Sequence, residues 1–527
     1  MHETLPFLFA VVILIVLVNM LAKKINIAYP ILIVVAGLLI SMIPSVPPLR
    51  LDPDWVFFII LPPLLFEAAW SISFKGLLRW WRIIGSFSFL VVFFTASAVA
   101  FFANYFIPGF SLALGFLLGG IVSPPDAVSA GAIMKFVKIP KSTATILEGE
   151  SLFNDASSLI IFRFALIAVA TGQFIWSEAL LSFGWMVLGG VGVGIILGWT
   201  FFLAHKRLPT DAPSNIVFTL LEPFILYWVA EQMGSSGVMA VVTGGLFLAN
   251  RRFQILDSEG RIRGFSFWQS FVFILNGIVF FVIGFDLNEV VSGLSQANIS
   301  IRDGIYYGVI ITAFIIFIRI VSSYIALFST MIFRRSMISP DFNFRRSWKT
   351  PLVLGWTGMR GVVTLAAASS IPIYLDDGQL FPQRDLILFI SFMVIILTLF
   401  VQGLTLPFIL KRIRLNRMIP ATESEHQFEK RLRKELWSFS IAEIKDKHKA
   451  DGKENVFLVS NLVKWQRKLD GLEEDLITPE TKSVYLELLN AQRHFLIEQN
   501  KDPNVDEEII RKEITLIDFE EEKIKMM

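Results

Sequence analysis

The chain is dominated by apolar segments that are long enough to cross a lipid bilayer. A spanning helix needs about 20 mostly apolar residues. Thirteen segments meet or approach that length: residues 5–22, 26–44, 55–73, 83–107, 110–134, 145–173, 177–204, 215–233, 235–249, 265–287, 304–333, 350–374 and 385–410. Since 54% of the residues are hydrophobic and only 17% are charged, the sequence predicts an all-α polytopic membrane protein.

Basic residues in the loops predict the orientation of these segments. Counted from the amino end, alternate loops hold 23 Lys and Arg residues, whereas the other set holds only Arg50, Arg302 and Arg384. Basic loops stay in the cytoplasm, so we expect the amino terminus outside and the carboxyl terminus inside a cell inner (plasma) membrane. The first segment has no basic residue before it and no small-residue cleavage site, which favours an uncleaved helix over a signal peptide.

Residues 421–527 have a different character from the rest of the chain. They carry 18 basic and 24 acidic residues, whereas residues 1–420 carry 29 basic and 21 acidic residues. Periodic stretches at 428–444 and 482–498 predict amphipathic helices, and Pro479 is typical of a helix start. We therefore predict a membrane domain at 1–420 and a cytosolic helical tail at 421–527. A binding site for an unknown regulator and a plain tail with solvated charged faces both fit this pattern.

Two of the predicted spans are interrupted. The fifth contains Ile121-Val-Ser-Pro-Pro-Asp126, where adjacent prolines remove two backbone donors. The twelfth places Gly355, Gly358 and Gly361 around Arg360. In transporters, broken helices at corresponding positions of two inverted repeats mark the substrate site. Segments 4–6 and 11–13 each form a triplet with a broken middle helix and cross in opposite directions, so we predict an inverted repeat.

Asp155 is the strongest candidate for a functional residue. It lies within the apolar segment 145–173, where an aspartate costs at least ~2.5 kcal/mol and usually handles an ion or a proton. The alternative is a carboxylate at a helix start, where the helix dipole favours an acid. Ser151 lies on the same helix face, four residues earlier, and offers a hard oxygen ligand. Asp126 follows the broken backbone and can cap the next half-helix, ligate a cation, or do both.

Three further polar residues are predicted near this site. Glu67 could bind a cation through water or hydrogen-bond to Asn154, and the sequence favours neither. Arg360 does not lose its proton in practice, so burial requires an acid partner. We predict that Glu150 is this partner in a structural salt bridge.

Other patterns carry no predicted transport chemistry. We expect Arg163 and Arg319 to reach the interface or backbone carbonyls, and we assign them no role in transport. The row Gly190, Gly194 and Gly198 predicts close approach of two helices. The chain has no cysteine and only five scattered histidines, so we expect no resident cofactor and no thiolate metal site. Nothing indicates a nucleic-acid partner.

Six motifs occur in a specific order and spacing across the predicted membrane domain. Through them, residues 1–415 resemble the monovalent cation/proton antiporter-1 family, which includes the NhaP-type bacterial antiporters and the Na⁺/H⁺ exchangers. The motifs are Leu61-Pro-Pro-Leu-Leu-Phe-Glu67, Ser123-Pro-Pro-Asp-Ala127, Gly149-Glu-Ser-Leu-Phe-Asn-Asp155, Ser236-Gly-Val-Met-Ala-Val-Val242, Leu275-Asn-Gly-Ile-Val-Phe280 and Gly358-Met-Arg-Gly361.

The resemblance implies a thirteen-helix fold, a homodimer, and a six-helix core of helices 4–6 and 11–13 that moves against a dimerisation domain. It implies that Asp155 binds Na⁺ and protons alternately. The implied Na⁺ ligands and supporting residues are Asp155, Ser151, Asp126, the backbone carbonyl of Pro125, Glu67 through water, Asn154 as a structuring residue, and Arg360 paired with Glu150. Some relatives have Thr at the position of Pro125, so one hydroxyl is lost here.

We therefore expect a secondary antiporter that exchanges Na⁺ or Li⁺ for H⁺ and serves pH and sodium homeostasis. Exchange should be electroneutral, since neutral Asn154 stands where electrogenic relatives have a second aspartate. The alternatives are a K⁺/H⁺ antiporter, a channel and an intramembrane hydrolase. A hydrolase needs a nucleophile with a base, but no Ser–His or Cys–His set lies within the predicted spans. A channel does not need a titrating acid beside a buried arginine.

Overall fold

The computed structural model describes residues 4–25, 27–44, 46, 55–126, 131, 141–172, 176–208, 211–297, 299–333, 349–375, 378–412, 425–448, 456–469, 479–499 and 507–526. Across these ranges the regular structure is helical, and the only β pairing is an isolated bridge between Tyr374 and Leu380. The predicted all-α class is confirmed. The chain separates into two compact units, Met1–Pro420 and Ala421–Met527.

The first unit is a bundle of apolar helices. Within its described part, eight helical segments are long and apolar enough to cross a membrane, which supports a multi-span membrane protein. The helices are α1 (Thr4–Ile25), α2 (Tyr29–Ser41), π-helical η1 (Val56–Ile60), α4 (Leu61–Ser71), α5 (Phe74–Gly85), π-helical η2 (Ser86–Val91), α6 (Val92–Phe106), α7 (Leu112–Val122), α9 (Lys141–Thr171), α10 (Trp176–Arg207), α11 (Ala212–Gln232), α12 (Gly237–Ala249), α13 (Arg252–Ile255), α14 (Ser258–Phe285), α15 (Leu287–Gln296), α16 (Ile301–Phe333), α18 (Lys349–Trp356), α19 (Val362–Ser369), α20 (Arg384–Leu397), π-helical η4 (Thr398–Gln402) and α21 (Gly403–Arg412).

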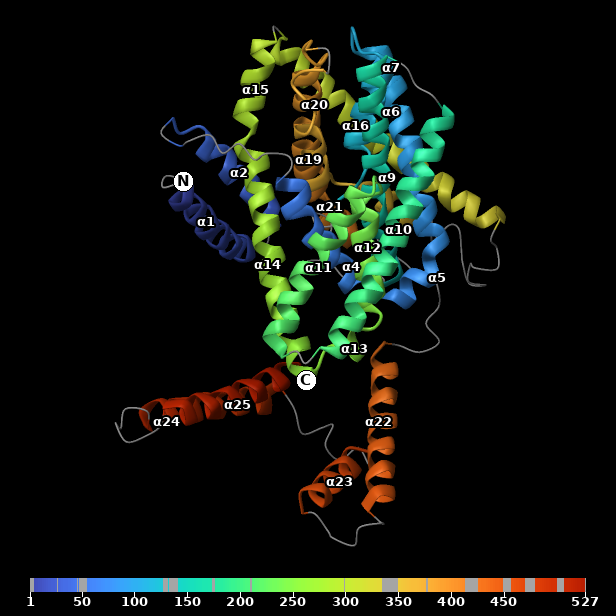
Figure 1. Ribbon diagram of the computed structural model, residues 1–527. Helices are drawn as coiled ribbons and strands as arrows, with labels where there is room; N and C mark the ends of the chain where they lie inside the picture. Colours follow the sequence, from blue (N-terminus) through green and yellow to red (C-terminus); the bar gives the residue numbers. More distant parts are fainter. Residues whose placement is uncertain are drawn as a thin grey trace. The chain divides into compact units, whose positions relative to one another are not determined.

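Helices α2 and α14 lie side by side (Figure 1). Their backbones meet at two glycines, because a Cβ at Gly37 would collide with the carbonyl of Phe281 and a Cβ at Gly284 would collide with the carbonyl of Val34. Small residues allow such close approach between membrane helices, where packing contributes most of the association energy.

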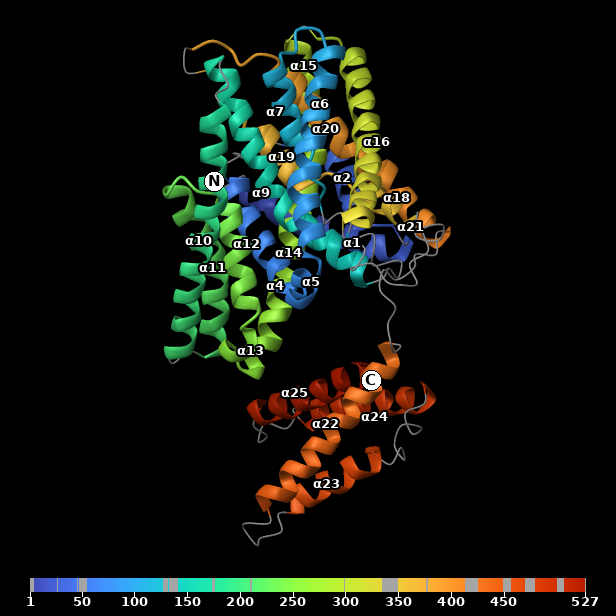
Figure 2. The same cartoon turned by 90° about the vertical axis from the view of Figure 1, so that its right-hand side faces the viewer.

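Helices α10, α11 and α12 form a second group (Figure 2). Gly190 of α10 lies against the carbonyl of Ser236, and Gly194 lies against the carbonyl of Ala240. A Cβ at either glycine would collide with these backbone atoms. The close helix approach predicted from the glycine row is therefore confirmed at these two positions.

In the described part of the first unit, the fifth and twelfth predicted spans are both interrupted, as expected. Helix α7 ends at Val122, and the chain is non-helical through Asp126. Residues 357–361 separate α18 from α19. Most of the chain from residue 127 to residue 140, including the second half of the predicted segment 110–134, lies outside the described residues.

The described residues of the second unit form four helices, α22 (Glu425–His448), α23 (Val456–Leu469), α24 (Pro479–Gln499) and α25 (Glu507–Met526). The helices predicted at 428–444 and 482–498, and the start at Pro479, are confirmed. Arg493 of α24 forms ion pairs with Asp518 at 2.6 Å and Glu521 at 2.5 Å. Charged side chains thus join α24 to α25.

We predict that Gly284→Ala lowers the melting temperature of the protein in detergent, because the new methyl group would force α2 away from α14. The matched control is Gly264→Ala in the same helix, where a Cβ would meet only Ile216 at 3.9 Å. Alanine is favoured over glycine within helices by about 1 kcal/mol, so the control should be neutral or stabilised. Equal melting temperatures for the two variants would contradict the close packing.

Candidate cation site

The two interrupted segments are hydrogen-bonded to each other. The backbone N–H of Asp126 donates to the carbonyl of Met359 at 2.7 Å. The Arg360 side chain donates from Nε to the carbonyl of Val122 at 2.8 Å and from Nη2 to the carbonyl of Ser123 at 3.3 Å. The last carbonyls of a helix lack helical donors, and a cation is favoured at this end of the helix dipole. Arg360 therefore caps the carboxyl end of α7.

Glycines make room for this arrangement in the break between α18 and α19. A Cβ at Gly361 would collide with the carboxylate of Asp126, and a Cβ at Gly358 would collide with the side chain of Arg319. The Arg360 side chain also donates from Nη1 to the carbonyl of Gly358, and its backbone N–H donates to Thr398 Oγ1 at 3.2 Å. The glycine-rich sequence thus lets two arginines and an aspartate share a small volume.

Helix α9 brings its polar residues to the broken segment after α7. Ser151 Oγ and Asn154 Nδ2 donate to the carbonyl of Pro125, at 3.2 Å and 3.1 Å. Ser151, Asn154 and Asp155 are 7%, 0% and 8% exposed. Asp155 also interacts electrostatically with Asp126. The structure therefore brings together five of the predicted site residues.

Two buried oxygens beside this cluster suit a hard cation or a water molecule. Ser123 Oγ and Asn154 Oδ1 are buried and have no hydrogen-bond partner. Leaving a polar group buried and unsatisfied costs about 1–3 kcal/mol. Carboxylate, carbonyl, hydroxyl and amide oxygens are the ligands that hard cations take. Residues of these types suit Na⁺, the cation that the resemblance implies. Among the described residues, no group of three or more His, Asp or Glu side chains could hold a resident metal.

The predicted partner of Glu150 is wrong. Arg319 of α16, not Arg360, pairs with it, with Nη2 2.8 Å from Glu150 Oε1. Both side chains are almost fully buried, at 2% and 1% exposed. The guanidinium of Arg360 is instead taken by backbone carbonyls at the end of α7 and in the break. The expectation that Arg319 reaches the interface or backbone carbonyls is therefore wrong as well. An arginine inside an apolar span signals the need for a polar partner, but not which partner it is.

The π-helical turn η2 is hydrogen-bonded to the same stretch of α9. Ser88 of η2 donates from Oγ to the carbonyl of Glu150 at 3.0 Å. Ser157 of α9 donates from Oγ to the carbonyl of Ser88 at 2.5 Å. π-Helical turns often occur at functional sites. Ser88 and Ser157 were not predicted, because isolated serines in apolar segments carry no distinguishing pattern.

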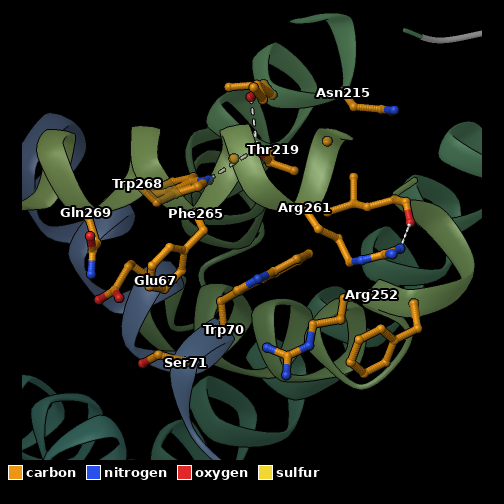
Figure 3. A pocket seen from close by; sticks show the side chains of 15 residues that line it. Glu67, Trp70, Ser71, Asn215, Thr219, Arg252, Arg261, Phe265, Trp268 and Gln269 are labelled. Carbon is orange, nitrogen blue, oxygen red and sulfur yellow. Dashed lines mark hydrogen bonds between the residues drawn. The ribbon is translucent and has the colours of Figure 1, made fainter. Parts of the chain in front are cut away.

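Glu67 lies in a separate pocket. Figure 3 shows Glu67 on one side of this pocket and Arg252 and Arg261 on the other. The pocket has a volume of about 280 Å³ and is lined by residues of α4, α11, α13 and α14. None of the other predicted cation ligands lines it. The contact of Glu67 with the cation through water stays a prediction.

We predict strong coupling between Glu150 and Arg319 in thermal unfolding. Glu150→Gln or Arg319→Met leaves one buried charge unpaired, which costs about 3–5 kcal/mol in protein interiors. The double variant should lose less stability than the sum of the two single variants. A parallel cycle of Glu150→Gln with Arg360→Met should show weaker coupling. Additive losses for Glu150 and Arg319 would show that the ion pair does not form.

Comparison with known proteins identifies the family. Residues 10–412 match the family described as "Sodium/hydrogen exchanger, transmembrane". The chain is 33% identical over 389 residues to the "Sodium, potassium, lithium and rubidium/H(+) antiporter" of Bacillus subtilis, covering 72% of this chain and 57% of that protein. The match thus spans little more than half the length of that relative. This chain is also 33% identical over 393 residues to the "Low-affinity Na(+)/H(+) antiporter NhaS1" of Synechocystis, covering 73% of this chain and 69% of that protein.

A solved structure supports the same assignment at the level of the fold. The sodium proton antiporter MjNhaP1 from Methanocaldococcus jannaschii aligns with a TM-score of 0.62 and 19% identity, covering 78% of this chain and 99% of that chain. At this identity the likeness shows the fold alone. Together with the family match over residues 10–412, it confirms the resemblance noted from the motifs: the chain belongs to the transmembrane sodium/hydrogen exchanger family.

Proposed function

We propose that the chain is a secondary active antiporter that exchanges Na⁺ for H⁺ across the cell membrane. The observation that carries the proposal is the burial of Asp155 beside Ser151 and the carbonyl of Pro125, where two interrupted helices meet. Family membership supports ion exchange, rather than an enzyme or a channel. The proposed physiological role is pH and sodium homeostasis.

Competition at Asp155 is the proposed source of coupling. A buried carboxylate is costly when charged and alone, so it favours either a bound proton or a bound cation. Asp126, which interacts electrostatically with Asp155, adds negative charge that favours either positive species. Because a proton and Na⁺ would neutralise the same carboxylate, one must leave before the other binds. Movement of the loaded site in both directions then exchanges the two ions.

The proposed architecture has thirteen spans, an inverted repeat and a mobile core. The core would comprise spans 4–6, formed by α5–η2–α6, α7 and α9, and spans 11–13, formed by α16, α18–α19 and α20–η4–α21. The hydrogen bond from Asp126 to Met359 joins the breaks in the two middle spans, as expected of corresponding helices. We further propose a homodimer in a plasma membrane, with the amino terminus outside and the helical tail 421–527 in the cytosol.

The ligand types at the site suit more than one alkali cation. Pro125 offers a carbonyl but no hydroxyl, so the ligand set does not distinguish alkali cations by residue type. The name of the Bacillus subtilis relative includes sodium, potassium, lithium and rubidium. A K⁺/H⁺ antiporter with the same mechanism is therefore the second candidate. Transport assays in everted membrane vesicles with Na⁺, Li⁺ and K⁺ separate the two.

We predict that Asp155→Asn abolishes exchange of every cation in everted vesicles, because the amide keeps the shape but removes the titrating charge. The protein should still fold, as judged by its melting curve in detergent. Asp303→Asn, at an exposed position in the first turn of α16, is the control and should retain exchange. Normal exchange by folded Asp155→Asn protein would exclude the proposed mechanism.

We predict that exchange is electroneutral, with one proton per monovalent cation, because Asp155 is paired with neutral Asn154. A net moved charge would couple transport to membrane voltage by about 2.3 kcal/mol per 100 mV. In proteoliposomes with a Na⁺ gradient and a voltage clamped by an ionophore for an ion that is not transported, the pH gradient at zero flux should not depend on voltage. A shift with voltage would mean that a second acid, such as Asp126 or Glu67, also titrates.

A further inference from the structure

A second ion pair joins the helix that carries Asp155 to a different group of helices. Arg163 of α9 donates from Nη2 to Glu231 Oε2 of α11 at 2.6 Å. Arg163 lies eight residues before the end of α9 at Thr171, and Glu231 is the penultimate residue of α11. The pair therefore lies toward the carboxyl ends of both helices.

The two partners belong to differently packed parts of the first unit. Helix α9 packs mainly against α5, η2 and α7, and its Phe162 and Ala165 lie in an apolar cluster with α6, α7, α16 and α20. Helix α11 packs against α10, α12 and α14, and its Ala230 lies in a small cluster with Val193 and Ala240. The ion pair thus bridges the proposed core and the helices beside it.

Glu231 has a second hydrogen-bond partner, at the start of α12, that does not depend on Arg163. Its Oε1 accepts a hydrogen bond at 3.0 Å from the backbone N–H of Gly237, the first residue of α12. A carboxylate is favoured at this end of a helix, where N–H groups are free and the dipole is positive. If Arg163 moved away with α9, Glu231 would keep this partner.

Exposure distinguishes this pair from the ion pair at the candidate site. The side chains of Arg163 and Glu231 are 39% and 18% exposed, whereas those of Arg319 and Glu150 are 2% and 1% exposed. The Arg163–Glu231 pair is thus less enclosed by protein than the pair at the candidate site. Separating a fully enclosed pair is costly, because it leaves a buried charge without a partner. Since fewer packed groups surround Arg163 and Glu231 and Glu231 keeps its hydrogen bond to Gly237, this pair can break and re-form during a transport cycle.

We propose that Arg163 and Glu231 form a reversible latch, which closes one side of the ion pathway and opens when the core moves. The inference rests on the proposed function, in which α9 moves against α10–α12. Both α9 and α11 follow loops with basic residues that are predicted to be cytoplasmic. The latch then closes the outer side, and in this state Asp155 is reached from the cytoplasm.

Cross-linking tests the latch directly, because the chain has no native cysteine. Arg163→Cys and Glu231→Cys would be combined and joined with a reducible bifunctional methanethiosulfonate reagent of matching length. Exchange in proteoliposomes should fall at least tenfold on cross-linking and recover on reduction. The control is Glu259→Cys with Arg263→Cys, which replaces an exposed ion pair within α14 alone and should retain exchange when cross-linked. An unchanged rate in the cross-linked Arg163/Glu231 variant would overturn the latch.

Single substitutions give a second, independent readout. Arg163→Gln or Glu231→Gln should destabilise the outer-closed state, so the apparent affinity for external Na⁺ should rise severalfold while that for internal Na⁺ falls. Arg163→Lys, which keeps a positive charge beside Glu231 and leaves the Gly237 contact of Glu231 intact, should largely retain the original ratio, whereas a purely structural role would not depend on that charge. If both affinities stay unchanged in folded single variants, no latch exists. If Asp155→Asn abolishes exchange and the cross-link does not, the latch fails but the proposed function stands.

Discussion

The capping of α7 by Arg360 is the interaction on which the candidate site depends. An interrupted helix inside a membrane leaves carbonyl groups without donors, and hydrocarbon offers none. Arg360 supplies these donors to Val122 and Ser123 from the other interrupted segment, and Asp126 returns a backbone hydrogen bond to Met359. Backbone groups at each break are therefore hydrogen-bonded by residues of the other break. These hydrogen bonds keep residues 123–126 non-helical, so that the Pro125 carbonyl can accept hydrogen bonds from Ser151 and Asn154 of α9.

Charge balance around this junction follows from the same arrangement. Arg319 and Arg360 are both fully buried and close enough to interact, so two positive charges share one region. Glu150 pairs with Arg319 directly, while Arg360 is bound by neutral carbonyls. The carboxylate of Asp126 lies against Gly361 in the same break, and Asp126 interacts electrostatically with Asp155. A proton or Na⁺ on Asp155 thus changes the charge of a region whose other ionised groups are held in place by buried hydrogen bonds.

The sequence predicted most features that depend on local spacing. Apolar segments predicted helices, adjacent prolines and clustered glycines predicted the interruptions, and the spacing of Ser151 and Asp155 placed them on one face of α9. The partner of Glu150 could not be predicted this way, because Arg319 and Arg360 are both long side chains in apolar segments. Which one reaches Glu150 depends on the orientation of α16 and on the carbonyls that compete for Arg360. The pocket around Glu67 likewise depends on how α4 packs against α11 and α14.

The ion pairs of the membrane unit differ in burial in a way that matches what each must do. The pair of Glu150 and Arg319 is sealed from water, so its loss would leave a charge that nothing can solvate, and it behaves as a fixed part of the site. The pair of Arg163 and Glu231 is less enclosed by protein, so fewer packed groups have to move when it separates, and Glu231 keeps its hydrogen bond to Gly237. A transporter needs both kinds of contact. The site must remain intact while it moves, and the contacts at its edge must be able to break.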